Sequence, residues 1–432
     1  MENSETIAGT SLENPDGLHK DEGVLHQVKE ANKEDGKEDS GISSEDQTSK
    51  EQYSRTVKEL DSQHFVVQSD KLKDPNICLD APFYCELCAV KLGNLNACQS
   101  HVKTKGHKKV KKTKGEFFSL LRVAPPSEHQ ILALNTLLDS VFLKHGLCPV
   151  KDFPTRQEIA KDVGKTVCDK FPECSVSIYG SSFTGFGLQE SDVNLDLVIP
   201  DEVDVPHVLL SILDLLRKDE HYCDVKSEFD AKVPRILFKH LSSGLVCELS
   251  PGNGTAFKTS CLLKKYCDFD PRVRTLAVAL RYWARICNVD CQAEGGLPGY
   301  SLALMVIQFL QETKPPVLPR LMPYEAIDKD SPHASENFVS GNKEEIGSLW
   351  FQLFRFYCVE FDIQNLVISI KDSIPVTRES KRWGHRRVAV EDPFSSKRNV
   401  ACSLSSDRAY DYFFTCWKNS FLYFSSLPQN GK

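Results

Sequence analysis

The spacing of hydrophobic residues changes along the chain and divides it into four zones. Residues 1–50 contain no Phe, Trp or Tyr and many Glu, Asp, Lys and Ser. Such a segment cannot bury enough apolar surface to offset the entropy lost on ordering, so we expect residues 1–77 to form a disordered acidic tail. A small module at 80–114 and a connector at 115–125 come next, and regular patterning begins after Pro126.

From there onwards, apolar residues recur first at mixed spacing and then mainly at helical spacing. Ser127 is a favourable N-cap for the first helical segment. Period-two alternation on either side of Gly180 indicates strands. The expected helices cover 131–142, 154–170, 208–216, 273–286, 300–311 and 344–361, and the expected strands cover 176–178, 193–197, 225–229, 235–240 and 245–250. This order predicts an α+β fold, with an α/β domain at about 150–255 and helices after it.

Composition narrows the compartment and the partners. The net charge of −7 argues against a uniformly basic coat for nucleic acid. The first residues lack the basic and apolar regions of a signal peptide, and no apolar run reaches the roughly 18–20 residues of a membrane span. We therefore expect a cytoplasmic protein, with the nucleus as the alternative, and no membrane partner. In a reducing compartment most of the 16 cysteines are expected to be buried thiols.

Four residues in the module after the tail have the spacing of a metal site. Cys85 and Cys88 are separated from His101 by twelve residues, and five residues lie between His101 and His107. Two thiolates and two imidazoles suit tetrahedral zinc, and so short a segment needs the metal in order to fold. We predict a structural C2H2 zinc finger, with Cys98 as a spare thiol.

A lysine-rich stretch accompanies the second histidine. The gap between the histidines, with Gly106 before the second, resembles the U1/matrin-like finger family, whose members often bind double-stranded RNA by shape. Lysines beside such a finger are expected to contact phosphates. RNA, double-stranded or in a stem-loop, is therefore the expected partner, and a solvated face or a protein-docking surface is the alternative. The candidate RNA-binding residues are Lys103, Lys105, Lys108, Lys109, Lys111 and Lys112.

A glycine-rich turn followed by a polar strand carries the candidate catalytic chemistry. Gly180 lets the backbone turn sharply, and Ser181 and the following amides could then meet phosphate oxygens. Residues two apart on a strand face the same side of a sheet. The strand after the turn carries a polar triplet at this spacing, consisting of Asp192, Asn194 and Asp196.

Two carboxylates at this spacing can coordinate two divalent ions. In such a site a third acid comes from a neighbouring strand. Glu248 is the candidate for the third acid. The middle residue of the triplet is Asn194, a neutral amide that cannot bridge two cations. Asp196 lies about 13–14 Å along the strand from Asp192, too far to substitute for the missing acid.

From about residue 127 to its end, the chain resembles the non-canonical poly(A) polymerase and terminal uridylyltransferase family. The resemblance implies a polymerase-beta-like nucleotidyltransferase domain plus a helical poly(A)-polymerase-associated domain at 127–432, preceded by the zinc finger. It implies metal-binding roles for Asp192 and Glu248. It also implies nucleotide-binding roles for Gly180, Ser181, Arg281, Arg285 and Tyr300. The segments that carry the resemblance are Gly180-Ser181 with Ser191-Asp192, Glu248-Leu-Ser, 270–285, 296–311 and Glu391-Asp392-Pro393-Phe394 with Asn399.

With the finger upstream, the arrangement is most similar to the N-terminal module of the large zinc-knuckle terminal uridylyltransferases. There, a finger precedes a degenerate nucleotidyltransferase copy that is implicated in gripping microRNA precursors together with an RNA-binding protein. A second copy performs the chemistry. This chain departs from the family's active pattern at Asn194, Glu248, Thr259 and Gly299. Active members that select uridine usually have a histidine after the segment that corresponds to Glu391-Asp392-Pro393-Phe394, whereas no histidine follows His385 here.

We therefore predict an RNA-binding, catalytically inactive module that resembles a terminal uridylyltransferase. Its expected setting is RNA 3′-end uridylation or microRNA-precursor processing, with an RNA-binding protein as a second partner. The first alternative is an active RNA uridylyl- or adenylyltransferase that uses magnesium or manganese. The second alternative is a zinc-containing protein scaffold.

Overall fold

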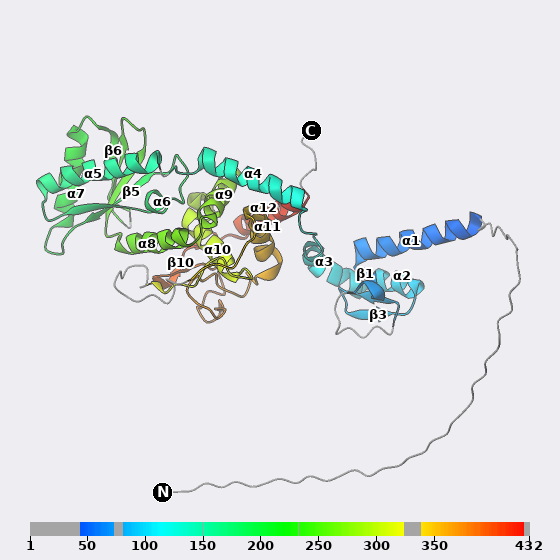
Figure 1. Cartoon of the computed structure of the whole chain (residues 1–432). Helices are drawn as coiled ribbons and strands as arrows, with labels where there is room; N and C mark the ends of the chain where they lie inside the picture. Colours follow the sequence, from blue (N-terminus) through cyan, green and yellow to red (C-terminus); the bar gives the residue numbers. More distant parts are fainter. Residues whose placement is uncertain (1–43, 73–80, 149, 232, 324–337, 427–432) are drawn as a thin grey trace, which may run out of the picture. The chain divides into compact units, whose positions relative to one another are not determined.

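The structure is a computed structural model that describes residues 44–72, 81–148, 150–231, 233–323 and 338–426 (Figure 1). The chain divides into two compact units, Met1–Lys103 and Thr104–Lys432. Each unit has its own pattern of secondary structure. Among the residues described, no helix has both the length and the apolar character that crossing a membrane requires.

The first unit is built on a small antiparallel sheet in the order β1-β2-β3. Phe83 pairs with Gln68 on one side and with Leu92 on the other. The buried residues of this sheet and its helices include Val66, Phe83, Leu92 and Val102. The elements of the unit are α1 (Ser44–His64), β1 (Val66–Gln68), η1 (Ser69–Lys71), β2 (Phe83–Cys85), β3 (Val90–Leu92) and α2 (Leu95–Lys103).

Part of the expected tail is folded, so the expectation is wrong for residues 44–72. Helix α1 packs against β1 and α2, and Leu60 and Phe65 are each only 4 % exposed. The lack of aromatic residues, on which the expectation rested, ends at residue 50. Beyond that point Leu60, Phe65 and Val66 supply the apolar surface that ordering requires. Residues 1–43 and 73–77 of the expected tail lie outside the described part of the chain.

The second unit begins with α3 (Lys105–Leu121), which continues through most of the segment expected to be a connector. Thr104 is its N-cap, and its hydroxyl accepts a hydrogen bond from the His107 amide at 3.2 Å. Near its end Leu120 is buried, and the helix contacts the π-helix η4 (Phe356–Glu360). The apolar residues of this last stretch of α3 therefore favour a helix over a loop.

A five-stranded mixed sheet forms the centre of the α/β part, in the order β4-β5-β8-β7-β6. Strands β5 and β8 run parallel, and the other neighbouring pairs run antiparallel. Each expected strand in this region is present. The bounds are β4 Ser175–Tyr179, β5 Val193–Val198, β6 Tyr222–Glu228, β7 Arg235–His240 and β8 Val246–Pro251.

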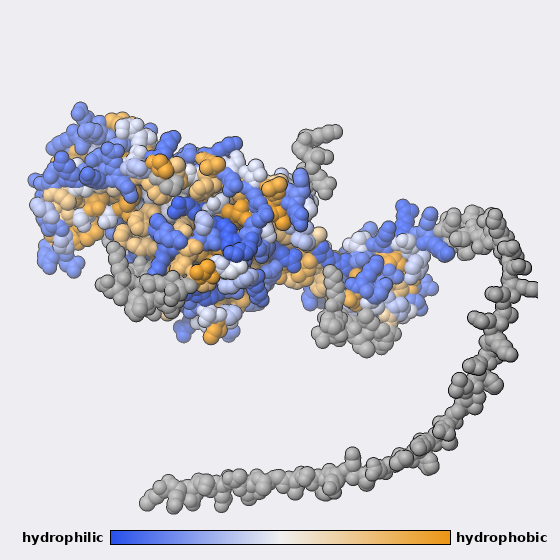
Figure 2. Space-filling view, viewed as in Figure 1, coloured by the Kyte–Doolittle hydropathy of each residue, from blue (hydrophilic) through white to orange (hydrophobic). Residues whose placement is uncertain are grey.

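The two faces of this sheet differ in chemistry. Val193, Leu195 and Leu249 point to one face and are fully buried in a cluster with residues of α5 (Asp152–Lys170) and α7 (Val205–Lys218). The outer surface around these helices and β6 is largely hydrophilic (Figure 2). The opposite face carries the polar residues that alternate with this apolar set. Successive residues of β5 therefore point in turn to the apolar core and to the polar face that carries the candidate site.

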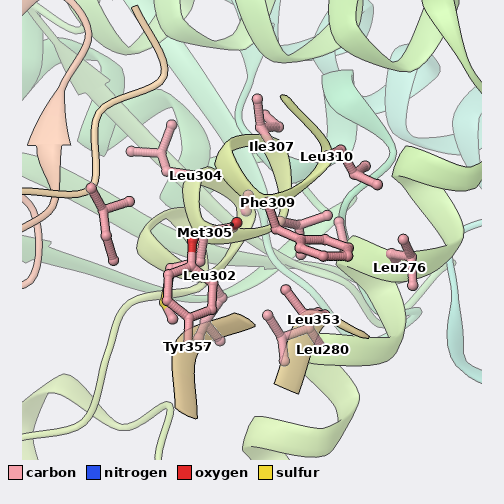
Figure 3. Packing of buried hydrophobic residues seen from close by; sticks show 14 of the residues in the cluster. Leu276, Leu280, Leu302, Leu304, Met305, Ile307, Phe309, Leu310, Leu353 and Tyr357 are labelled. Atoms are coloured by element: carbon pink, nitrogen blue, oxygen red, sulfur yellow. Dashed lines mark hydrogen bonds between the residues drawn. The ribbon is translucent and has the colours of Figure 1, made fainter. Parts of the chain in front are cut away.

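The remaining helices share a second core, at whose centre lies α10 (Gly299–Glu312). Figure 3 shows its side chains surrounded by Leu276 and Leu280, by Leu353, and by Tyr357, whose hydroxyl donates to the Met305 carbonyl at 2.8 Å. Trp283 packs edge-on against other aromatic rings of this core. The other elements of this part are α4 (Glu128–His145), α8 (Gly254–Phe269), α9 (Arg272–Ile286), η2 (Gln292–Glu294), α11 (Ile346–Arg355), β9 (Glu391–Asp392), β10 (Ser395–Asn399) and α12 (Asp407–Ser425).

Candidate functional site

The turn after β4 is held in place from two sides. Gly180 has φ +69°, a left-handed conformation that favours glycine, and leads into the short helix α6 (Ser181–Thr184). Its amide donates to Ser260 Oγ on α8 at 2.8 Å. A Cβ atom at Gly180 would lie 3.0 Å from Asn194 Oδ1. The amide side chain of Asn194 is therefore packed directly against the turn.

Arg156 on α5 joins this turn to the start of the acid strand. It is 1 % exposed and donates to Ser182 Oγ at 2.7 Å, to the Asp192 carbonyl at 3.1 Å and to the Gln189 carbonyl at 2.9 Å. Sequence reasoning missed this residue. In the sequence, Arg156 falls on the same helix face as Ile159 and the other apolar residues of α5. A cation that faces solvent would not be placed on that face, so its position indicates a buried arginine.

The remnant acids come together along the polar face of the sheet. Asp192 immediately precedes β5, and Asn194 pairs in parallel register with Glu248 on β8. Burial raises the pKa of Glu248, the charge of Arg235 opposes that shift, and the charge of Asp192 adds to it. Asp192 and Glu248 are therefore close enough to influence each other. Asn194 lies directly beside Glu248, at the position where a two-ion site needs its second metal-binding acid.

Glu248 is already paired with a cation of the chain itself. Arg235 Nη1 on β7 donates to Glu248 Oε2 at 3.2 Å, and Arg235 Nε donates to Glu228 Oε2 at 2.7 Å. The Glu248 side chain is 21 % exposed. A pair of divalent ions requires bridging carboxylates that are free to bind them. With a neutral amide at Asn194 and an ion-paired Glu248, these residues do not fit a two-ion site.

Asp196 has a different task. It is buried, and its Oδ1 accepts a hydrogen bond from the Asn253 amide at 2.9 Å, just before α8 begins. Burial raises the pKa of Asp196. This carboxylate therefore holds the N-terminal end of α8 and does not stand in for the acid missing at Asn194.

A pocket of about 230 Å³ opens beside the turn. Four of the five candidate nucleotide-binding residues line it, namely Gly180, Ser181, Arg281 and Tyr300. Arg285 does not, because its side chain is 46 % exposed and pairs with Glu190 at 3.0 Å. The other lining residues are Tyr179, Thr184, Phe186, Ala256, Thr259, Ser260, Leu263, Gly299, Ala303 and Arg398.

Arg281 gives this pocket a positive charge. Burial lowers its pKa, and the charge of Arg285 lowers it further. Its Nη1 donates to the Phe186 carbonyl at 3.4 Å, and within the described part of the chain it forms no salt bridge. A Cβ atom at Gly299 would lie 3.3 Å from Arg281 Nε, so the glycine at this departure from the family pattern leaves room for the guanidinium.

The lining of the pocket also includes Tyr300 and, from the β9–β10 hairpin, Arg398. Burial raises the pKa of Tyr300, and Asp392 adds to the shift. Arg398 pairs with the buried Asp392 at 3.2 Å. Sequence reasoning found Asp392 through the Glu391-Asp392-Pro393-Phe394 segment but missed Arg398, although it lies only six residues further on.

The four predicted metal ligands also converge. The ligand atoms of Cys85, Cys88, His101 and His107 all lie within 4.8 Å of one another. In a tetrahedron with metal–ligand bonds of about 2.0–2.3 Å, neighbouring ligand atoms are about 3.3–3.8 Å apart. Two thiolates and two imidazoles suit zinc, so this set fits the metal that the spacing predicted. Cys98 is buried nearby and is not one of the four.

The candidate RNA-binding lysines lie around the second histidine. Lys103 ends α2 and the other five lie on α3, and all are exposed except the partly buried Lys111. At roughly 100° per residue, Lys105, Lys108, Lys109 and Lys112 fall within an arc of roughly 100° on one helix face. We call these four residues the α3 lysine face.

Comparisons with known proteins agree with this architecture. Residues 113–251 match the TUTase nucleotidyltransferase domain, and residues 345–398 match the Cid1 family poly A polymerase. The chain is homologous to the terminal uridylyltransferases. It is 33 % identical over 413 residues to Terminal uridylyltransferase 4 of Homo sapiens, covering 81 % of this chain and 25 % of that protein. With Terminal uridylyltransferase 7 of Homo sapiens the identity is 34 % over 405 residues, covering 83 % and 27 %.

The chain thus spans about a quarter of the length of these two terminal uridylyltransferases. Among solved structures, it resembles the Cid1 poly(U) polymerase with Mg and 3′-dATP bound, with a TM-score of 0.62 and 21 % identity over 68 % of this chain and 95 % of that one. The fold is therefore a polymerase-beta-like nucleotidyltransferase fold with a poly(A)-polymerase-associated helical domain. The α+β fold class predicted from the sequence is confirmed for this region.

Proposed function

We propose that this chain is an RNA-binding, catalytically inactive terminal-uridylyltransferase-like module that acts in RNA 3′-end uridylation or microRNA-precursor processing. The observation that carries this proposal is that the side chains of β5 supply no second acid that is free to bind a metal ion. Asn194 offers an amide beside Glu248, and the Asp196 carboxylate accepts a hydrogen bond from Asn253. Neither residue leaves a carboxylate that could complete a two-ion site with Asp192.

The missing acid weighs heavily on catalysis. In phosphoryl transfer the protein mainly positions the reactants, and metal ions neutralise the charge that develops. Losing one metal carboxylate should therefore lower the rate by orders of magnitude while leaving binding surfaces in place. The homology to terminal uridylyltransferases supports RNA 3′ ends as the setting.

The finger supplies the proposed contact with RNA. Cys85, Cys88, His101 and His107 would hold a structural zinc ion, whose binding would supply folding free energy to this small segment. The α3 lysine face would then contact phosphates of double-stranded or stem-loop RNA, in a way that depends on salt and not on sequence. We also propose an RNA-binding protein as a partner and the cytoplasm as the compartment.

The direct test is nucleotide addition. Purified protein is incubated with UTP or ATP, an RNA with a free 3′ end, and magnesium or manganese. We expect no extension by the wild type, whereas Asn194→Asp gains activity if the amide alone blocks it. Extension by the wild type that Asp192→Ala abolishes would overturn the proposal.

An active uridylyl- or adenylyltransferase is the second candidate. The pocket that contains Arg281 and Tyr300 favours it, because a nucleotide site would still be needed. It predicts nucleotide-dependent thermal stabilisation that requires a divalent ion. A pure protein scaffold, the third candidate, predicts no salt-dependent RNA binding, and binding that is unchanged when Lys108, Lys109, Lys111 and Lys112 are substituted would favour it.

A further inference from the structure

The sheet carries a cation of its own at the remnant site. Arg235 lies on β7 between two acids, with Glu228 opposite it on β6 and Glu248 on β8. Its guanidinium reaches both carboxylates, at 2.7 Å and 3.2 Å. All three residues lie on the polar face, since Leu237, two residues beyond Arg235, is in register with Glu248.

This arrangement fixes the charge around Glu248. The carboxylate that the family resemblance assigns to a metal ion shares the guanidinium of Arg235 with Glu228, so its side chain is already engaged by a cation of the chain. A divalent ion bound at Glu248 would lie within a few ångströms of Arg235 and be repelled by it. The neutral Asn194 beside Glu248 offers no further charge to attract such an ion.

The adjacent pocket contains a positive charge, that of Arg281, which does not pair with a carboxylate among the residues described. Arg281 lines it and forms no salt bridge among the residues described, whereas Arg285, one turn further along α9, pairs with Glu190. The pocket wall also includes Tyr179, whose strand position is in register with Asn194. The pocket and the Arg235 pair therefore belong to one continuous face.

We propose that the pairing of Arg235 with Glu248 keeps divalent ions out of the remnant site, so that the pocket binds a nucleoside phosphate through Arg281 without any metal. The ligand is either free UTP or the 3′-terminal nucleotide of an RNA, which share a uridine and a phosphate group. This inference rests on the proposed function, because a chain that needed metal for transfer would need it here too.

Calorimetric titration with UTP, and separately with a short oligouridylate, distinguishes the two sources. Each titration is done in EDTA and in magnesium. For the wild type we expect the same Kd in both buffers for at least one ligand. Arg281→Gln should weaken binding by about tenfold or more, because it removes a charge-assisted hydrogen bond to phosphate. Arg217→Gln, at the exposed end of α7 and outside the pocket lining, is the control and should leave Kd unchanged.

Substituting Arg235 tests its role directly. Arg235→Leu should weaken binding in EDTA, with magnesium restoring it, because Glu248 is then left uncompensated. Arg235→Lys keeps the charge and should keep the same Kd in both buffers, which guards against a folding defect in the leucine variant. A wild type that binds only with magnesium, or an Arg235→Leu variant that behaves as wild type, would overturn the inference.

Absence of binding to both ligands in both buffers would also overturn it, and would leave an inactive, finger-based RNA module standing. Nucleotide transfer by the wild type would instead overturn the proposed function itself. Failure of this inference and failure of the proposed function therefore give different experimental results.

Discussion

Arg156 Nη1 donates a hydrogen bond to Ser182 Oγ at 2.7 Å and thereby connects α5 to the turn after β4. The same buried guanidinium also donates to the Gln189 and Asp192 carbonyls. Arg156→Met removes three hydrogen bonds that the buried guanidinium donates, so we expect the free energy of unfolding measured by urea denaturation to fall by about 2–4 kcal/mol. Arg217→Met at the exposed end of α7 is the matched control. A loss no larger than that of Arg217→Met would show that Arg156 does not hold the turn.

The pKa of Glu248 gives a dependence on pH. Burial raises it above its unfolded value, so the stabilising contribution of this group is complete below the unfolded pKa and disappears as pH rises through the folded pKa. Glu248→Gln does not titrate. Its stability relative to wild type should therefore increase as pH rises from acidic to neutral values, as measured by thermal unfolding. A relative stability that falls over this window would contradict the direction of the shift.

How much of this site the sequence could predict depends on how local each signal was. The strands and the placement of Asn194 beside Glu248 follow from period two and from the family resemblance. The pairing of Arg235 with Glu248 does not, because it depends on the register of β7 against β8. Arg398 reaches the pocket through a hairpin more than 100 residues beyond Arg281. The composition of residues 1–50 does not indicate helix α1, because its buried apolar residues, Val57 and Leu60, lie beyond that segment.

Removing the metal should unfold the finger. A zinc chelator is expected to abolish the helical signal of this segment and expose it to trypsin, because the ligand set and not a large core would hold it together. Cys88→Ser should lose zinc, as measured by elemental mass spectrometry. Cys98→Ala, also in this segment but outside the ligand set, should retain it. Retention of zinc by Cys88→Ser would exclude this thiol as a ligand.

The α3 lysine face should determine how RNA binding responds to salt. Changing its four lysines to glutamine should weaken binding to a stem-loop RNA. The slope of log K against log salt should fall by roughly 0.7–0.9 for each phosphate that the protein no longer neutralises. The control changes exposed lysines of α4 and α5, at Lys144, Lys161, Lys165 and Lys170. An equal effect of both sets would indicate that net charge alone controls RNA binding.

Gly180 and Asn194 allow strain and crowding to be separated. Gly180→Ala places a Cβ at a positive φ and 3.0 Å from Asn194 Oδ1, whereas Gly252→Ala has a positive φ with no atom within 4 Å. Both variants should lose about 1 kcal/mol or more from backbone strain, and Gly180→Ala should lose more because Asn194 must move and because its ψ of −146° lies outside the left-handed helical region. Combining Gly180→Ala with Asn194→Ala should recover the excess in a double-mutant cycle followed by urea denaturation. If the two changes are simply additive, Asn194 does not pack against the turn, and its amide would be free to face a ligand.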